Sequence, residues 1–218
     1  SYFNVNSYSP IQHSGSSLNN KTASSVCVAR DGKLWIGTDG GGINVFDKGK
    51  RVAVYKEESG DLTDNSIQAA LCDSEGNLWF GSFMGGVDFY DVKKKSFHQI
   101  FPKDKTGEDV RALYEDAEYV WIGTSNGIYK IRLHDKGIAD HYTVENNLVR
   151  CISKDNLNRL WIGTFGGGLG VFDEHFQCDK LFNVTSLFPS NTINTVYMDS
   201  QNRMWIGMGE GLVCFPSS

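Results

Sequence analysis

A short motif built around tryptophan occurs five times in this chain and constrains its fold more than any other feature. Each copy reads as an apolar residue, then Trp, then Ile or Phe, then Gly. The copies contain all five tryptophans of the protein: Trp35, Trp79, Trp121, Trp161 and Trp205. Successive tryptophans are 44, 42, 40 and 44 residues apart. An aromatic strand that recurs about every 40–45 residues is typical of the blades of a β-propeller.

The second unit shows the expected strand pattern most clearly. Its apolar or alternating runs predict four strands, over residues 65–73, 78–83, 87–91 and 97–101. Turn residues separate the runs, among them Gly76, which tolerates the positive φ of a hairpin turn. Four antiparallel strands joined in this way form one propeller blade. We therefore predict an all-β protein made of five repeats, each a blade of four antiparallel strands.

We expect a single β-propeller over residues 1–218. Its blades are placed at about 20–60, 61–104, 105–145, 146–188 and 189–218. The last unit lacks a sequence for a fourth strand, whereas Tyr2–Asn6 is similar to Leu181–Thr185, the outer strand of the fourth unit. Two alternatives stay open. Either residues 1–6 complete the last blade and cover its free edge, or the chain is part of a larger propeller.

Acidic residues recur in the turn that precedes the tryptophan. In three units an aspartate is followed three residues later by Gly or Asn, a pattern that predicts a turn closed by the aspartate side chain. These aspartates are Asp73, Asp155 and Asp199. We interpret Asp31–Lys33 of the first unit as a shortened turn, and Glu115 with Glu118 in the third unit as a different one. Because the pattern repeats, turn formation explains these residues better than catalysis or calcium binding.

Composition and charge exclude several classes of function. The net charge of −5 and the pI near 5.5 argue against binding to nucleic-acid phosphates. The cysteines number five and form no Cys-x-x-Cys pair, and the five histidines have no metal-ligand spacing. Cys27, Cys72 and Cys151 precede tryptophans in apolar runs and are expected in the core. We expect no cofactor, no metal and no membrane contact by this chain, which lacks a long apolar run.

The repeated pattern resembles the two-component regulator propeller family. The resemblance is strongest over Asn65–Phe89 and Asn191–Phe215, weaker over Leu34–Phe46 and Leu160–Phe172, and weakest in the third unit, where Val120 and Ser125–Gly127 depart from it. It covers almost the whole chain.

The resemblance implies an extracytoplasmic, periplasmic-side sensor of a hybrid two-component protein, of the kind found in gut Bacteroidetes. Such a sensor would detect an oligosaccharide and signal to a histidine kinase, which this chain lacks; a homodimer is a further expectation. The chain starts without Met or a signal peptide, so we interpret it as a processed chain or a fragment.

A ligand site is expected at one mouth of the propeller channel. The positions assigned there follow the first apolar residue of each inner strand: Cys27, Gln68, Arg111, Arg150 and Asn194. Four of them are polar, and the two arginines suit sugar hydroxyls or a uronate carboxylate. The alternative is a channel that is polar only because water fills it. Phe83 and Phe165 follow the second strand, where they would either stack on sugars or fill the gap between blades.

Two other functions compete with a non-catalytic sensor. A propeller enzyme acting on polysaccharide, a glycosidase or lyase, needs acidic residues that converge on one mouth. The acidic residues that do not recur from unit to unit show no such pairing by spacing: Asp39, Asp88, Glu108 and Glu210. A protein-interaction scaffold is the other alternative, and the sequence separates it from a sensor only through the family resemblance. The repeated tryptophans are assigned to packing between blades and are not expected to contact a ligand.

Overall fold

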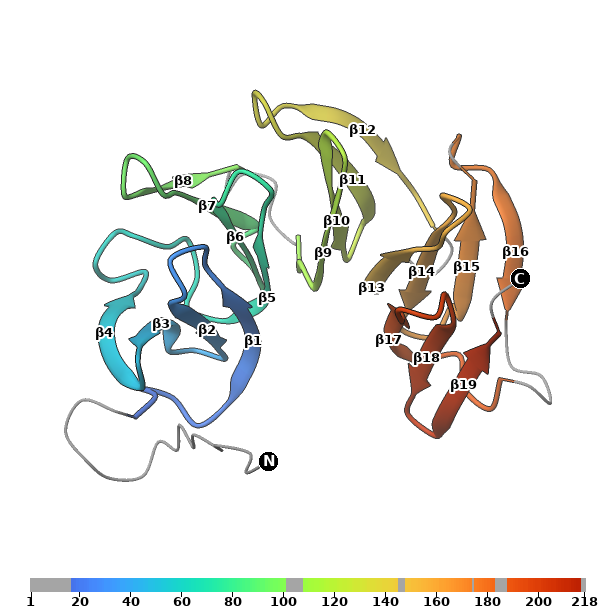
Figure 1. Ribbon diagram of the computed structural model, residues 1–218, viewed down its shortest axis with the longest axis horizontal. Helices are drawn as coiled ribbons and strands as arrows, with labels where there is room; N and C mark the ends of the chain where they lie inside the picture. The colour runs from blue at the N-terminus through green and yellow to red at the C-terminus, as the bar shows by residue number, and fades with distance from the viewer. Residues whose placement is uncertain (1–16, 101–107, 145–147, 174, 183–187, 217–218) are drawn as a thin grey trace. The chain divides into compact units, whose positions relative to one another are not determined.

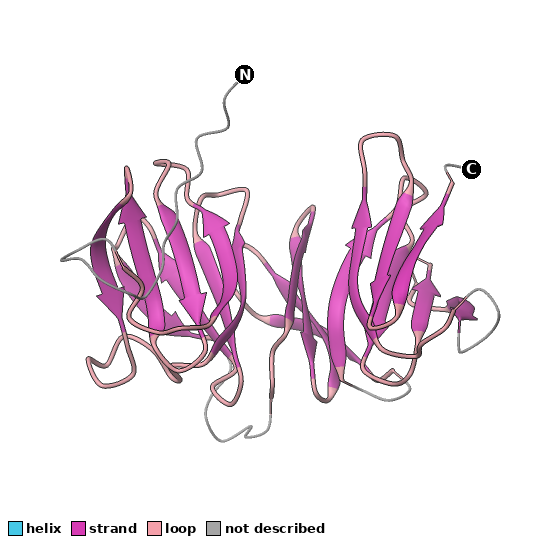
Figure 2. Ribbon diagram, turned by 90° about the horizontal axis from the view of Figure 1, so that it is seen from below, coloured by secondary structure: helices cyan, strands magenta, loops and turns pink. Residues whose placement is uncertain are grey.

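The structure of the protein is a computed structural model that describes residues 17–100, 108–144, 148–173, 175–182 and 188–216. Within these ranges the secondary structure consists of 19 β-strands in five antiparallel sheets (Figures 1 and 2). They contain no helix long and apolar enough to cross a membrane. The chain divides into two compact units, residues 1–110 and 111–218, which are described separately.

Unit 1 contains two four-stranded sheets. The first orders its strands as β1 (Ala23–Val28), β2 (Leu34–Thr38), β3 (Gly42–Asp47) and β4 (Lys50–Tyr55). The second orders them as β5 (Ile67–Cys72), β6 (Leu78–Ser82), β7 (Val87–Asp91) and β8 (Ser96–Gln99). Each strand pairs with its neighbour in the sequence, and β1 packs against β5.

Unit 2 contains two four-stranded sheets and one three-stranded sheet. The first comprises β9 (Ala112–Asp116), β10 (Tyr119–Thr124), β11 (Gly127–Arg132) and β12 (Ile138–Tyr142). The second comprises β13 (Val149–Lys154), β14 (Leu160–Thr164), β15 (Leu169–Phe172) and β16 (Cys178–Phe182). The third comprises β17 (Ile193–Met198), β18 (Met204–Met208) and β19 (Gly211–Phe215). Strand β13 packs against both β9 and β17.

These sheets confirm the predicted all-β fold with propeller blades of four antiparallel strands, of which the last has three within the described residues. The alternative in which residues 1–6 complete the last blade lies outside the described residues. The extent of one propeller over residues 1–218, and its blade boundaries, stay predictions.

The tryptophan strand is the second strand of every sheet, and its apolar side chains fill the space between sheets. Trp35 of β2 lies 5.8 Å, centroid to centroid, from the ring of Phe80 in the next sheet, and Trp161 of β14 lies 5.3 Å from that of Phe215. Trp121 of β10 likewise stacks, at 6.1 Å, on Phe176 in the turn between β15 and β16 of the following sheet. The assignment of these three tryptophans to packing between blades is confirmed.

In three of the five units, the glycine that follows the tryptophan by two residues is required because neighbouring sheets approach closely there. A Cβ atom at Gly163 would lie 2.5 Å from Cγ2 of Ile193 in the next sheet. Gly37 and Gly123 face the same conflict, with apolar side chains at 2.6 and 2.5 Å. Because real Cβ contacts are longer than this, only glycine lets the blades pack at this distance.

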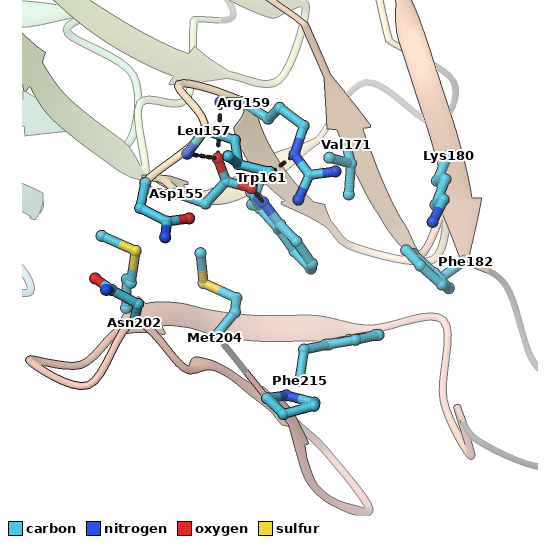
Figure 3. Close-up of a pocket in the computed structure, with 13 residues that line it drawn as sticks. Asp155, Leu157, Arg159, Trp161, Val171, Lys180, Phe182, Asn202, Met204 and Phe215 are labelled. Atoms are coloured by element: carbon cyan, nitrogen blue, oxygen red, sulfur yellow. Dashed lines mark hydrogen bonds and ion pairs between the residues drawn. The ribbon is translucent and has the colours of Figure 1, made fainter. Parts of the chain in front are cut away.

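The aspartates before the tryptophans close their turns as predicted. Asp155 Oδ1 accepts hydrogen bonds from the backbone N–H groups of Leu157 and Arg159, both at 2.9 Å. Its other oxygen accepts a hydrogen bond from Nε1 of Trp161 at 2.8 Å, a contact that the sequence analysis missed (Figure 3). The equivalent bonds from Trp79 to Asp73 and from Trp205 to Asp199 are also 2.8 Å long. The turn and the tryptophan are therefore held by the same carboxylate.

The prediction of a shortened turn in the first unit is wrong. Ala29 N–H donates to the carbonyl of Lys33, and Gly32 N–H donates to that of Ala29, both at 2.9 Å. The turn after Asp73 has the same two bonds at the same lengths. Ala29 therefore occupies the aspartate position, so the turn keeps its length and loses only the carboxylate. Within the described residues Trp35 Nε1 is buried and has no hydrogen-bond partner.

The third unit has a different turn, as predicted. Asp116 pairs directly with Tyr119, so only Ala117 and Glu118 connect the two strands. Ala117 takes a φ of 50°, which suits a tight two-residue hairpin. The aspartate position is lost, and Trp121 Nε1 is buried without a hydrogen-bond partner among the described residues.

Candidate functional site

Three of the predicted site residues occupy one structural position in their sheets. Gln68, Arg150 and Asn194 each sit where the inner strand has one extra residue relative to the second strand. Such a bulge bends the strand and re-aims the side chain of the extra residue. Arg111 stands just before β9, where its N–H donates to the carbonyl of Gly123 at 3.1 Å.

The assignment of Cys27 to this position is wrong. The register shift of β1 lies between Ala23 and Ser25, so Ser24 is the equivalent residue. Ser24 Oγ donates to the carbonyl oxygens of Gly37, at 3.2 Å, and Ile67. Cys27 packs against the hydrophobic core, and burial raises the pKa of its thiol to about 12. The error arose because β1 begins in a polar stretch that hides its first residues in the sequence.

In unit 1 the predicted site is a chain of hydrogen bonds at the start of β5. Gln68 Nε2 donates to Ser66 Oγ at 3.0 Å, and Ser66 Oγ donates to the carboxylate of Asp39. Phe83, of which 44% is exposed, is anchored by its backbone N–H to the Ser66 carbonyl at 2.9 Å. Ser66 thus joins three residues that the sequence leaves apart, and its role was missed because serine is common in turns.

In unit 2 the structure brings Arg150 and Phe165 together. The guanidinium carbon lies 5.7 Å from the centroid of the phenyl ring, within the range of a cation–π contact. Phe165 is 53% exposed, and its N–H donates to the carbonyl of Leu148 at 2.9 Å. Asn194 is exposed on β17. Strand β13 packs against both β9 and β17. Arg111, just before β9, therefore forms a row with Arg150 and Asn194 at the starts of three neighbouring inner strands.

Two of the four acidic residues considered for catalysis, Asp39 and Asp88, are engaged in structural contacts. Asp88 is buried and accepts hydrogen bonds from the N–H and the hydroxyl of Thr63, at 3.0 and 2.9 Å. Asp39 accepts from Ser66. Among the described residues, no group of three or more His, Cys, Asp and Glu side chains is arranged to hold a metal ion.

A pocket of about 380 Å³ lies between the last two sheets, near the turns that precede β14 and β18 (Figure 3). Its walls include Trp161, Phe182, Met204 and Phe215. Asp155 also lines it, with its carboxylate occupied by the hydrogen bonds described above. The sequence analysis missed this pocket because residues of two different sheets form it.

The comparisons with known proteins agree on the repeat. The family described as two component regulator propeller matches residues 17–40, 61–84, 143–166 and 187–210. The third unit, where the sequence resemblance is weakest, has no match of its own. No curated protein matches the sequence.

Solved structures similar to this chain include extracellular domains of two-component systems and a lyase. The extracellular domain of the hybrid two-component system BT3049 from B. thetaiotaomicron is 48% identical, with a TM-score of 0.88 over 95% of this chain and 28% of that one. The corresponding domain of BT4673 is 20% identical, with a TM-score of 0.79 over 98% of this chain and 32% of that one. Virginiamycin B lyase from Staphylococcus aureus is 17% identical, with a TM-score of 0.71 over 91% of this chain and 71% of that one.

The chain spans about three tenths of the length of the two B. thetaiotaomicron domains. At 20% and 17% identity, BT4673 and the lyase share the fold alone. The 48% identity to BT3049 and the four matched repeats go further: this chain belongs to the two-component regulator propeller family.

Proposed function

We propose that this chain is part of the extracytoplasmic sensor region of a hybrid two-component protein, on the periplasmic side, and that it binds an oligosaccharide without cleaving it. The 48% identity to an extracellular domain of a hybrid two-component system supports the sensor role. The contact between Arg150 and the exposed Phe165 ring carries the choice of ligand.

The chemistry of this pair suits a sugar. A flat aromatic ring offers a surface on which the apolar face of a sugar ring stacks. A guanidinium group donates two parallel hydrogen bonds to a carboxylate, or single ones to hydroxyls. Arg111 and Asn194 extend the row of donors along successive inner strands, so more than one sugar unit can be contacted. A uronate-containing oligosaccharide is therefore the ligand class that this row fits best.

The test is isothermal titration of the chain with plant, host and microbial oligosaccharides, including uronate-containing ones. Arg150→Gln and Phe165→Ala should each weaken binding about tenfold, the equivalent of about 1.4 kcal/mol. Arg132→Gln is the matched control, because Arg132 pairs with Asp135 in an exposed hairpin of the same unit. Its affinity should stay unchanged, and chromatography should recover the sugar intact.

Two results would contradict the proposal. The first is slow cleavage of a sugar by the chain, which would show that the chain is a polysaccharide-acting enzyme. The second result is that a chain shown to be folded by circular dichroism gives no binding heat with any sugar of the panel. The sugar site would then lie elsewhere in the full-length protein, or the binding partner would be a protein.

A further inference from the structure

Unit 1 has its own pocket between sheets, and one residue distinguishes it from the pocket of unit 2. In unit 2 the carboxylate of Asp155 accepts hydrogen bonds from Trp161 and Arg159 in the pocket wall (Figure 3). In unit 1 the equivalent wall residues are Ala29, Trp35 and Lys33, as the matching turn bonds establish. The wall therefore lacks one negative charge, and Lys33 pairs with Asp31 instead.

The pocket has the size and lining of a small-molecule site. Its volume is about 530 Å³, within the range of about 300–1,000 Å³ usual for ligand pockets. Trp35, Tyr55 and Tyr90 form an aromatic wall: the first two rings stack at 5.5 Å with 4° between their planes, and Trp35 lies 4.9 Å from Tyr90. Val45 and Leu78 add aliphatic surface. Such a lining binds an apolar or aromatic body.

The charges that line the pocket favour an anion. Arg30 and Lys95 line it, and neither makes an ion pair among the described residues. Two acidic residues also line it: Asp31, which is paired with Lys33, and Glu75, which accepts a hydrogen bond from Asn77 at 3.3 Å. The pair of Lys33 and Asp31 is neutral, which leaves the cations Arg30 and Lys95 against the carboxylate of Glu75. The lining therefore carries excess positive charge.

The buried indole nitrogen adds a hydrogen-bond donor behind this wall. Trp35 is 5% exposed, and its Nε1 has no partner within the described residues, whereas Trp79, Trp161 and Trp205 donate to an aspartate. A buried donor without a partner is unfavourable. An acceptor that enters between the side chains of the wall would relieve that cost, in the role that aspartate has in the other units.

We propose that the pocket between β1–β4 and β5–β8 binds a small organic carboxylate with an aromatic or branched apolar body. The body packs against Trp35, Tyr55 and Tyr90, and the carboxylate is held by Arg30 and Lys95. This site is separate from the one proposed for oligosaccharide. Gln68 lies at the start of β5, whereas the pocket adjoins the turn at Glu75 and Gly76, beyond the end of β5.

The probe is 4-hydroxyphenylacetate, with its neutral counterpart 4-hydroxyphenylethanol, titrated into ¹⁵N-labelled chain and followed by the indole N–H signals. The signal of Trp35 is assigned with Trp35→Phe. We expect it to shift saturably with the carboxylate at up to about 20 mM, a range that covers weak sites with Kd of about 1 mM. The neutral counterpart should bind several-fold more weakly.

Three variants separate the site from a general effect of charge or folding. Lys95→Gln should weaken binding about threefold to tenfold at about 0.15 M salt, because it removes one partly screened cation. Lys94→Gln, its neighbour outside the pocket, is the matched control and should change affinity less than about twofold. Ala29→Asp should weaken binding about tenfold or more, since it places a like charge in the wall. Because it also gives Trp35 an acceptor, this variant should unfold at the same or higher temperature.

The proposal is overturned if the Trp35 signal does not respond to the carboxylate, or if the alcohol binds equally well. It also fails if Ala29→Asp binds the probe as tightly as the parent chain. These measurements use no sugar, so their outcome does not depend on the outcome of the oligosaccharide test.

Discussion

The bond between the turn aspartate and the tryptophan predicts a measurable loss of stability on Asp155→Ala. Asp155 Oδ2 accepts from Trp161 Nε1 at 2.8 Å, and Trp161 is only 6% exposed. Removing the acceptor leaves a largely buried N–H unsatisfied, at a cost of about 1–3 kcal/mol. Two backbone bonds of the turn and the partly exposed ion pair with Arg159 add about 1 kcal/mol, since water replaces most of them. We expect a total loss of about 3 kcal/mol.

Asp173→Ala is the matched control within the same unit. Asp173 accepts the same two turn bonds, from the N–H groups of His175 and Gln177 at 3.0 and 2.8 Å, but within the described part of the chain no tryptophan donates to it. Its loss should cost about 1 kcal/mol. Asp155→Asn keeps an acceptor while removing the charge, so it should cost clearly less than Asp155→Ala.

The assay is urea unfolding followed by tryptophan fluorescence and circular dichroism. The reasoning is refuted if Asp155→Ala and Asp173→Ala lower the free energy of unfolding equally, because the indole bond would then contribute nothing. If Asp155→Asn costs as much as Asp155→Ala, the charge and not the acceptor stabilises the turn.

Further predictions concern packing, pH and thiol chemistry. Gly163→Ala places a Cβ 2.5 Å from an isoleucine of β17 and should cost about 1–3 kcal/mol in urea unfolding, whereas Gly209→Ala, with open space around it, should cost almost nothing; equal costs would contradict the packing argument. Hydrogen bonds from Trp205 and Arg203 hold the pKa of Asp199 below its usual value, against a smaller opposing effect of partial desolvation. Its contribution to stability is therefore present above about pH 4 and is lost as pH falls through the lower folded-state pKa. Asp199→Asn should therefore flatten the acid limb of stability against pH, and an unchanged limb would exclude this residue as a source. Burial raises the pKa of the Cys27 thiol to about 12, so iodoacetamide near neutral pH should label the exposed Cys178 far faster than Cys27; similar rates would show that β1 opens readily.

Several features were predictable from the sequence because they depend on neighbours along the chain. The strands around Trp79 were expected over 65–73, 78–83, 87–91 and 97–101, and the structure has β5 to β8 in those places. Hairpins connect consecutive strands, so turn residues and alternating apolar residues are sufficient to locate them. The aspartate turns were predictable for the same reason.

The first unit shows where this reasoning failed. Its turn was interpreted as shortened because Asp31 was the nearest acidic residue, whereas the backbone bonds place Ala29 at the aspartate position. The misplaced Cys27 has a related cause, since β1 begins in the polar residues before it. Where the aspartate that defines the turn is replaced, the sequence no longer shows how the unit aligns with the others. The backbone hydrogen bonds show that alignment.

The candidate site was predictable as a set of positions but not as an arrangement. The sequence singled out Arg150 and Phe165, yet gave no reason to pair them, since one lies on β13 and the other just after β14. A register shift in β13 and the close approach of neighbouring strands bring them to 5.7 Å.

The sequence by itself therefore determined the repeat, the strand order and the family, because a blade is built from local hairpins whose signals lie within about 40 residues. The tertiary structure decided why the motif glycines Gly37, Gly123 and Gly163 are required and where the pockets between sheets lie. Those features depend on distances between strands from different blades. Such distances are fixed by packing, and a single strand's residues do not encode them.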